Sequence, residues 1–387
     1  MVQNYYLYLK FFSMNFDAIA NRALNLEPLT LEEGLMLYEQ APTSKLTYIA
    51  NQLRQKFHPG NTVTWITERN INITNICISG CTFCNFHRMI NDEETYTTTF
   101  EKYRTKIKAM LELGGSQLLI QGGIHPQHGI QYYCDLFSRL KEEFPGISLH
   151  ALGTPEIVHI AQRERMTYRE VLEKLLESGL DSLPGAGSEI LCDHIRKTIQ
   201  TVKTRRDEWL GVMAEAHKLG MVTTATMMFG HIETMHERIG HLIYIRDLQS
   251  LKPPSSPGFK AFIPWPVMSE GTELGKLVKM TPVLPVEYIR TIAISRIILN
   301  NISNIQASWQ TIGKETAQAC LHAGANDLGS IMMEENGGST FGASNLYTAA
   351  EMQSTIVGAG FTPQLRSPDY NFIELPSVFE KYNSLSE

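Results

Sequence analysis

Three cysteines lie close together in the stretch Asn75-Ile76-Cys77-Ile78-Ser79-Gly80-Cys81-Thr82-Phe83-Cys84. Their spacing is Cys-x3-Cys-x2-Cys, and six cysteines scattered at random over a chain of 387 residues would produce it only about 0.001 times. Three thiolates on one short loop suit a cubane iron–sulfur cluster, which normally takes four. Supplying only three leaves one iron open, and an open coordination position is where a metal centre does chemistry.

A structural zinc site is the alternative for these cysteines. His87 follows Cys84 by three positions, so Cys77, Cys81, Cys84 and His87 could form a Cys3His site. Two observations favour the cluster. The cysteines directly follow a predicted strand of an α/β chain, where barrels place their active sites, and the chain is not a small module that needs a metal to fold.

The elements that position this loop alternate along the chain. Short β-rich runs end in Gly, Pro or polar residues, and amphipathic segments of about 12 to 18 residues follow them. Eight such runs indicate an α/β protein with a (β/α)8 TIM-type barrel rather than an open sheet. The predicted strands are Thr62–Ile76, Ser116–Ile120, Ile147–Leu152, Ser182–Leu183, Val222–Phe229, Lys260–Pro264, Asn304–Ser308 and Asp327–Ile331.

The predicted helices show apolar faces at helical spacing. Thr167 and Glu170 form a capping box that predicts the start of one of them. We expect three parts: N-terminal helices over residues 1–60, the barrel over 61–338, and a C-terminal extension over 339–387 that packs on the barrel. Met14 could be the true start, because the first 13 residues match no barrel element.

Composition excludes several other classes of protein. Hydrophobic residues make up 43% and charged residues 19%, which is normal for a globular chain, and the net charge of −6 argues against broad binding to nucleic acid or anionic membranes. No stretch reaches the roughly 18 consecutive apolar residues of a membrane span. Cys134, Cys192 and Cys320 are too scattered for a disulfide framework and are interpreted as small buried residues. We expect a cytoplasmic protein.

The pattern Cys-x3-Cys-x-Phe-Cys resembles the signature of the radical S-adenosylmethionine superfamily, with Phe83 as the aromatic residue before the third cysteine. The resemblance implies that Cys77, Cys81 and Cys84 bind a [4Fe–4S] cluster. In that superfamily the open iron binds the amino and carboxylate groups of S-adenosylmethionine. One-electron reduction then splits this cofactor into methionine and a 5′-deoxyadenosyl radical.

Later parts of the chain carry further motifs: Leu119–Pro126, Asp181–Leu191, Thr223–Gly230, Ala261–Pro266, Asn304–Trp309, Gly324–Ser330 and Glu334-Glu335-Asn336. Together they resemble the cyclic dehypoxanthinyl futalosine synthases of menaquinone biosynthesis. The resemblance covers about residues 30 to 370, and one departure is Gly185-Ala186-Gly187-Ser188, where a third glycine and an alanine are expected. The sister enzymes, aminofutalosine synthase and the tyrosine-using subunit of the deazaflavin chromophore synthase, remain alternatives.

The resemblance also implies a reaction. The radical takes the hydrogen from C4′ of the ribose of dehypoxanthine futalosine, and the carbon radical adds to the aryl ring of the same substrate. Loss of an electron and a proton then restores aromaticity. The reaction requires an electron donor such as flavodoxin or ferredoxin, and the sequence does not identify the base that takes the proton.

Residues near the strand ends are candidates for binding the cofactor, and each has a structural alternative. Gly122 and Gly123 could admit the methionine amino group or form a plain βα turn. Glu156 could bind cofactor or act as a favourable first-turn acid of a helix. For the Met228 side chain we prefer the alternative, simple barrel core. The full set of candidates is Phe83, Gln121, Gly122, Gly123, Glu156, Met228 and Gly230.

Three further residues are candidates for binding the substrate. His125 lies just beyond the two glycines and could meet a substrate carboxylate, although a lone histidine is more often structural. Asn326 and Glu334 flank the last predicted strand and could hold substrate hydroxyls. Ordinary turn chemistry at Asn326-Asp327 is the rival interpretation.

Overall fold

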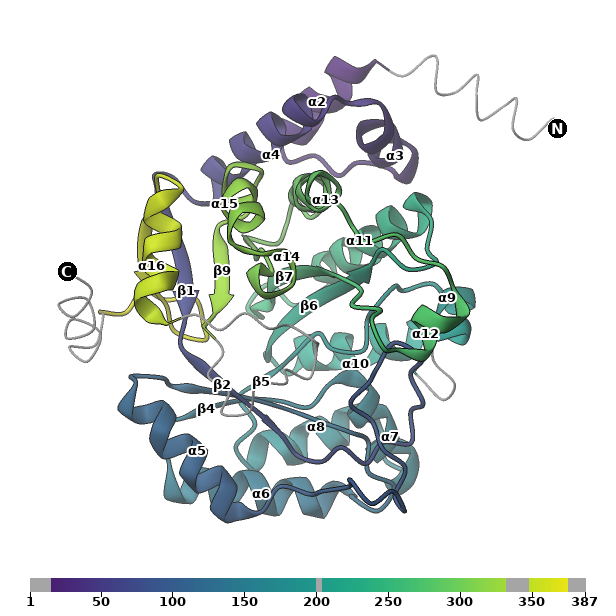
Figure 1. The fold of residues 1–387 in the computed structure, drawn as a ribbon, viewed down its shortest axis with the longest axis vertical. Coiled ribbons are helices and arrows are strands. Elements are labelled where there is room, and N and C mark those ends of the chain that lie inside the picture. Colours follow the sequence, from purple (N-terminus) through teal and green to yellow (C-terminus); the bar gives the residue numbers. More distant parts are fainter. Residues whose placement is uncertain (1–14, 200–203, 332–347, 375–387) are drawn as a thin grey trace.

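Parallel strands form the centre of the molecule, and helices surround them (Figure 1). The computed structural model describes residues 15–199, 204–331 and 348–374. The strands are β1 (Thr62–Ile66), β2 (Glu68–Asn72), β3 (Gln117–Gln121), β4 (Ser148–Ala151), β5 (Ser182–Leu183), β6 (Val222–Phe229), β7 (Gly258–Pro266), β8 (Asn304–Ile305), β9 (Asp327–Ser330) and β10 (Thr362–Leu365).

The strands close into a ring. One sheet has the order β2-β3-β4-β5-β6-β7-β8, and the other has the order β10-β1-β9. A parallel bridge between Gln306 and Asp327 joins β8 to β9, and β1 runs on into β2 through Thr67. With β1 and β2 as the two halves of the first strand, the ring has eight strand positions. The predicted (β/α)8 barrel is therefore confirmed.

The first strand is shorter and more irregular than the sequence predicted. A single strand over 62–76 was wrong, because the strand is interrupted at Thr67 and ends at Asn72. The interruption marks a change of partners: β1 pairs with β9 and β10, whereas β2 pairs with β3. The residues after Asn72 are thereby free to form the loop that carries the three clustered cysteines.

Most helices lie on the outside of the ring. Capping boxes start α3, α8, α11 and α16, including the predicted pair Thr167 and Glu170. The helices are α2 (Phe16–Leu24), α3 (Leu31–Gln40), α4 (Thr43–Phe57), α5 (Phe100–Glu112), α6 (Ile130–Glu143), α7 (Thr154–Glu164), α8 (Tyr168–Glu177), α9 (Asp193–Ile199), α10 (Arg206–Lys218), α11 (Met235–Ser250), α12 (Glu273–Leu277), α13 (Pro285–Ile298), α14 (Trp309–Ile312), α15 (Lys314–His322) and α16 (Ala349–Gly358).

The N-terminal helices α2 to α4 cover one end of the barrel, at the top of Figure 1. Arg54 of α4 is fully buried and donates to the carbonyl oxygens of Ala325 at 3.0 Å and Thr62 at 2.9 Å. Arg296 of α13 is also fully buried and donates to the carbonyl of Gly324 at 2.9 Å. These guanidinium groups satisfy backbone oxygens at the amino-terminal ends of the first and last barrel strands.

The C-terminal segment contributes β10, which pairs with the outer edge of β1, and the buried charged residue Arg366. Arg366 follows β10 and donates to both carboxylate oxygens of Asp327, at 2.6 and 3.2 Å. Its guanidinium also lies 3.8 Å from the centre of the Tyr370 ring. The predicted three-part division stays a prediction, because its boundary at 338–339 lies outside the described residues.

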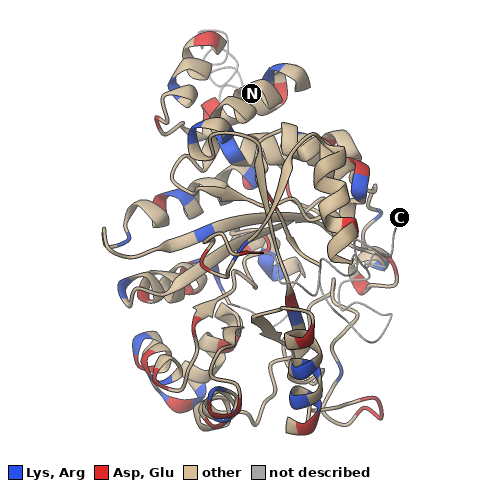
Figure 2. Ribbon diagram, turned by 90° about the vertical axis from the view of Figure 1, so that its left-hand side faces the viewer, with Lys and Arg blue, Asp and Glu red and all other residues tan. Residues whose placement is uncertain are grey.

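No helix in the described part of the chain is long and apolar enough to cross a membrane. Acidic and basic residues are interspersed along the outer helices (Figure 2).

Candidate active site

The loop that carries the cysteines begins where β2 ends and is held against the end of β3. The Ile73 amide donates to the carbonyl of Gln121 at 2.8 Å, and the Gly123 amide donates to the carbonyl of Thr74 at 2.7 Å. These bonds continue the β2–β3 pairing beyond the strands. The cysteines therefore lie at the carboxyl end of the barrel, where such folds place their chemistry.

The loop turns tightly around its own sulfur atoms. Gly80 has a φ of 59°, a left-handed conformation that favours glycine. The Ser79 amide donates to the Cys77 sulfur at 3.4 Å, and the Ser79 hydroxyl lies 3.3 Å from the Cys81 sulfur. Burial raises the pKa of the Cys77 thiol to about 11, which favours the protonated thiol at neutral pH, and a coordinated metal would favour the thiolate.

Residues far from the loop in sequence hold it in place through hydrogen bonds. The amide and hydroxyl of Thr82 both donate to the carbonyl of Ile199 at the end of α9, at 3.0 and 3.1 Å. The Thr82 carbonyl in turn accepts from the amide of Leu274 in α12 at 2.7 Å. Because Thr82 lies between Cys81 and Cys84, these bonds fix the part of the loop that spaces the two sulfurs.

The spacing of the thiols bears on which metal they fit. Ligand atoms around one tetrahedral zinc ion stand roughly 3.3–3.8 Å apart. Among Cys77, Cys81, Cys84 and His87, all within the described residues, no three ligand atoms lie within 4.8 Å of one another. The His87 ring also meets the carbonyl of Cys84 through Nδ1 at 3.0 Å. A cubane binds each cysteine at a different iron and needs wider spacing, so the donor set fits a [4Fe–4S] cluster better than zinc.

The two glycines after β3 lie directly against this loop. A Cβ atom at Gly123 would stand 2.2 Å from the carbonyl oxygen of Ile76 and 2.9 Å from the Cys77 Cβ. A Cβ atom at Gly122 would stand 3.0 Å from the Ile73 nitrogen. These glycines therefore allow a close approach of the backbone that leads to Cys77, whereas the predicted contact with the methionine amino group stays a prediction.

Besides Gln121, the inside of the barrel is lined by polar side chains that the sequence analysis did not single out, among them His150 and Glu68. Along β3 and β4, buried residues alternate with partly exposed ones such as Gln121 and His150. His150 Nδ1 lies 2.7 Å from the Ser182 hydroxyl, and the surrounding barrel wall lowers the His150 pKa to about 4. Glu68 on β2 is hydrogen-bonded to Gln117, and burial raises its pKa. The signal was readable on β4, where the polar residues Ser148 and His150 alternate with Leu149 and Ala151.

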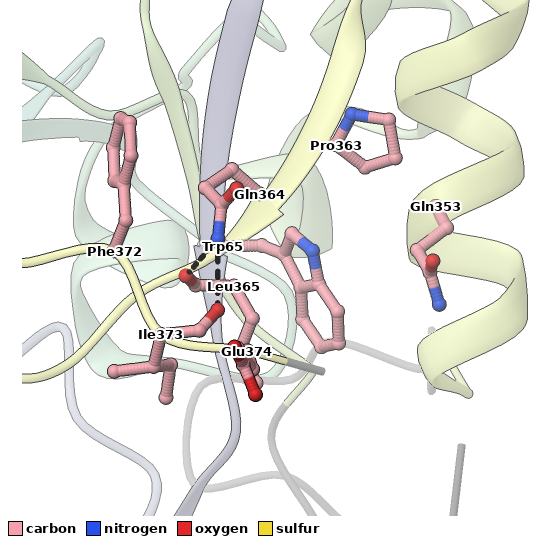
Figure 3. Close-up of a pocket in the computed structure, with 8 residues that line it drawn as sticks. All are labelled: Trp65, Gln353, Pro363, Gln364, Leu365, Phe372, Ile373 and Glu374. Carbon is pink, nitrogen blue, oxygen red and sulfur yellow. Dashed lines mark hydrogen bonds between the residues drawn. The ribbon is translucent and has the colours of Figure 1, made fainter. Parts of the chain in front are cut away.

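A separate hollow of about 530 Å³ lies between β1, β10 and α16. Figure 3 shows Trp65 and Gln353 on its walls, with the Gln364 side chain donating to the carbonyls of Leu365 at 2.9 Å and Ile373 at 2.8 Å. Its walls belong to the amino-terminal half of the first strand and the C-terminal segment. It is a feature of how the extension packs and contains none of the clustered cysteines.

Family models and relatives agree with this geometry. Residues 71–245 match the model described as "Radical SAM superfamily", and residues 256–379 match "CofH/MqnC C-terminal region". The chain is 38% identical to the cyclic dehypoxanthine futalosine synthase of Halalkalibacterium halodurans, over 93% of this chain and 95% of that protein.

The chain belongs to the radical SAM superfamily.

Other relatives within the superfamily carry two different names. The cyclic dehypoxanthine futalosine synthase of Streptomyces coelicolor is 39% identical over 92% of this chain and 88% of that protein. The 5-amino-6-(D-ribitylamino)uracil–L-tyrosine 4-hydroxyphenyl transferase of Archaeoglobus fulgidus is 39% identical over 84% of this chain and 93% of that protein. Membership in the radical SAM superfamily implies a [4Fe–4S] cluster and S-adenosylmethionine as cofactors.

Solved structures of radical SAM proteins share the fold. The hydrogenase maturase HydG of Carboxydothermus hydrogenoformans gives a TM-score of 0.70 at 15% identity, over 92% of this chain and 80% of that one. Methylornithine synthase (PylB) gives 0.65 at 18% identity, over 89% of this chain and 97% of that one. At these identities the likeness concerns the fold alone.

The predicted cofactor-binding residues lie on and beside the radical SAM cysteine loop. Phe83 is in the loop and packs partly against the core, and Gln121 ends β3 next to it. The Glu156 carboxylate accepts from the Gly153 amide at 3.0 Å and so caps α7, which is the structural alternative, and its charge also acts on Cys77. A role in binding S-adenosylmethionine stays a prediction for Phe83, Gln121 and Glu156.

Met228 and Gly230, two of the predicted cofactor-binding residues, lie at the carboxyl end of β6 and directly after it. The Met228 side chain is fully buried in the hydrophobic core, as the structural alternative proposed, and its amide donates to the Glu189 carbonyl at 3.0 Å. Gly230 has a φ of 85° and turns the chain out of the strand. Only their backbones remain candidates for contact with the cofactor.

Of the three predicted substrate-binding residues, the structure describes His125 and Asn326. His125 lies at the same end of the barrel as the cysteine loop and stacks on His128, with ring centres 3.9 Å apart. Burial lowers the pKa of His125, so a neutral imidazole would meet substrate through a hydrogen bond rather than through charge. Glu334 lies outside the described residues, and its assignment stays a prediction.

Asn326 is a correction. It precedes β9 at the amino-terminal end of the barrel and is 2% exposed. Its Oδ1 accepts from Arg296 at 2.7 Å and from the Ile305 amide at 2.9 Å, and its Nδ2 donates to Asn304 at 2.9 Å. The side chain is committed to structure at the end of the barrel opposite the cysteines, so we do not retain it as a substrate ligand.

Adding one methyl group at Gly123 should disrupt the cluster site. In Gly123→Ala the new Cβ would meet the Ile76 carbonyl at 2.2 Å, and backbone cannot give way as a flexible side chain can. We expect less than half of the wild-type iron after anaerobic reconstitution, measured by iron and sulfide analysis. Gly146→Ala is the matched control, because nothing lies within 4 Å of its added Cβ. Wild-type iron content in Gly123→Ala would show that the loop does not depend on this close approach.

Proposed function

We propose that this radical SAM protein cyclises dehypoxanthine futalosine to cyclic dehypoxanthinyl futalosine, with Cys77, Cys81 and Cys84 as the cluster ligands. The observation that carries the proposal is the three-thiol loop at the carboxyl end of the barrel, in a chain that aligns over 93% and 92% of its length with two cyclic dehypoxanthine futalosine synthases. The thiols leave one iron open, which is the position that S-adenosylmethionine takes in this superfamily.

The bound cluster and S-adenosylmethionine supply a 5′-deoxyadenosyl radical. The chain supplies position and shelter. Gly122 and Gly123 keep the end of β3 free of side chains beside the loop, so that backbone can reach the cofactor. The barrel wall excludes water from the site and so protects reactive intermediates. Polar side chains on the inner face, such as Gln121 and His150, offer hydrogen bonds to a ribose-containing substrate.

A transferase that joins tyrosine to a ribitylaminouracil is the second candidate. The Archaeoglobus fulgidus transferase is as similar in identity as the synthases, 39% against 38% and 39%. A second transferase of this name, from Methanococcoides burtonii, is 37% identical over 92% of this chain, so alignment length does not separate the two candidates. The motifs quoted above favour the cyclase.

Anaerobic turnover separates the two candidates. The reconstituted protein is given dehypoxanthine futalosine in one reaction, and tyrosine with 5-amino-6-(D-ribitylamino)uracil in the other. Mass spectrometry should find a cyclised product only in the first. Turnover of the second pair alone would move the chain to the transferase branch and leave the cluster assignment standing.

Deuterium labelling tests the position of attack. Hydrogen abstraction needs contact-distance alignment, so a substrate deuterated at ribose C4′ should pass its deuterium into 5′-deoxyadenosine, and the cyclised product should lack it. A substrate deuterated only on the aryl ring should pass none to the cofactor. We expect about one deoxyadenosine per product if the cofactor is consumed as the oxidant. Label arriving from another ribose position would exclude C4′ as the site of attack.

An electron donor and a cellular compartment complete the proposal. Reduction of the cluster requires a low-potential one-electron donor such as flavodoxin or ferredoxin. We place the protein in the cytoplasm, in keeping with the absence of a membrane-spanning helix from the described residues.

A further inference from the structure

A second group of metal-binding side chains lies outside the cysteine loop. Cys192 precedes α9, His194 lies in its first turn, and Glu237 lies in the first turn of α11. The Cys192 sulfur is 3.0 Å from His194 Nδ1 and 3.6 Å from Glu237 Oε1, and His194 Nε2 is 2.7 Å from the same oxygen. Within the described part of the chain this is the one set of three such residues whose ligand atoms all lie within 4.8 Å.

The Glu237 carboxylate is held in place before any ion arrives. Its Oε2 accepts from the Thr234 amide at 2.6 Å and from the Thr234 hydroxyl at 3.0 Å, as the capping box of α11. Its Oε1 faces Cys192 and His194. The side chain is only 11% exposed, so the carboxylate does not lose much freedom on binding an ion.

Thiolate, imidazole and carboxylate are the three ligand types that proteins offer to zinc. Sulfur and oxygen ligands of one tetrahedral zinc stand roughly 3.6 Å apart, given Zn–S and Zn–O bonds of about 2.3 and 2.1 Å. The separation of Cys192 Sγ from Glu237 Oε1 matches that value. We propose that Cys192, His194 and Glu237 bind one Zn²⁺ ion, with water as the fourth ligand.

Binding replaces hydrogen bonds by metal bonds. In the present arrangement the thiol donates to the carboxylate, and the imidazole lies against both partners. When Zn²⁺ enters, the Cys192 thiol releases one proton to solvent, and the ion bonds to the resulting thiolate, to one ring nitrogen and to Oε1. The ring must withdraw by about half an ångström and turn, which the 70% exposed His194 side chain is free to do.

The proposed zinc site lies at the start of the helix that is hydrogen-bonded to the cysteine loop. Helix α9 begins at the proposed ligands and ends at Ile199, whose carbonyl accepts both hydrogen bonds from Thr82 in the cysteine loop. Zinc between α9 and α11 would therefore fix the helix against which the cluster loop rests. The role inferred for the ion is to hold α9 against α11, and the proposal does not depend on which substrate the enzyme takes.

Zinc analysis of the cluster-loaded protein tests the proposal. The three loop cysteines are then occupied by iron and cannot take zinc. After equilibration with ZnCl₂ and gel filtration, we expect one zinc per wild-type chain and none in Cys192→Ala. Glu237→Gln should bind zinc at least tenfold more weakly while keeping the capping box, since Gln can also serve there. Cys134→Ala and His236→Ala are controls and should keep the full zinc content.

Zinc-edge X-ray absorption supplies the second measurement, because it identifies the ligands directly. One sulfur and three lighter ligands at zinc would support the proposal. Three sulfurs would place the ion in the cysteine loop and overturn it, as would undiminished zinc in Cys192→Ala. Zinc should also raise the Tm of the wild type but not of Cys192→Ala, because an ion that binds the native state stabilises it.

Discussion

Replacing Cys77, Cys81 or Cys84 with alanine should reduce turnover to background in each case. Two thiolates cannot hold a cubane with one iron open, and without the cluster no radical forms. Anaerobic reconstitution should give a broad absorbance near 400 nm in the wild type, a general property of such clusters, and the variants should lose most of it. Iron analysis and product formation are the measurements.

Matched controls make this first result specific. Cys134→Ala and Cys320→Ala remove thiols elsewhere on the barrel and should keep wild-type iron. His87→Ala should also keep its iron and sulfide, because the geometry favours a cluster held by three cysteines. Loss of metal from His87→Ala with retention in Cys77→Ala would favour the zinc site that the sequence left open.

The second large effect concerns stability. In Arg366→Ala the Asp327 carboxylate would remain buried without its bidentate partner, and breaking a buried pair in this way typically costs about 3–5 kcal/mol. We expect a loss of that size in the free energy of unfolding, measured by urea denaturation of the cluster-free protein.

A double-mutant cycle tests the cause of that loss. Arg366→Ala combined with Asp327→Asn removes both charges and should be less destabilised than the sum of the single variants. Arg169→Ala is the control, since its ion pair with Glu173 on α8 is half exposed and contributes roughly 0.3–0.5 kcal/mol. Additive single effects would mean that the buried pair is not what joins the extension to the barrel.

Local patterns predicted most of the fold because the barrel repeats one unit. Each strand of the ring overlaps a β-rich run that the sequence predicted, and the capping box at Thr167 predicted the start of α8, whereas β10 was not predicted. The interruption at Thr67 was not visible, because no glycine or proline separates β1 from β2 and the two strands are distinguished by their partners. One partner, β10, lies about 300 residues away, so no local window contains the information.

In the candidate site, too, the residues that could be predicted are those whose role depends on local sequence. Spacing alone identified the cysteine loop, since all its ligands lie within eight residues. Asn326 was wrongly assigned because the direction of its side chain depends on a hydrogen bond from Arg296, which lies on α13. His150 was readable from alternation on β4, but its hydrogen bond to Ser182 depends on the pairing of β4 with β5. Residues whose role is set by distant partners are those that the sequence did not place.

The pairing of β1 with β10 has a consequence for biosynthesis. Thr62 pairs with Thr362, so the first strand leaves the ribosome about 300 residues before its outer partner exists. At roughly 5–20 residues per second, the nascent chain waits about 15–60 s with that edge unpaired. The edge, Thr62-Val63-Thr64-Trp65-Ile66, is uncharged and β-prone, which is the composition that associates with other strands. Chaperone dependence during translation, and sensitivity to truncation before Leu365, follow from this order of synthesis.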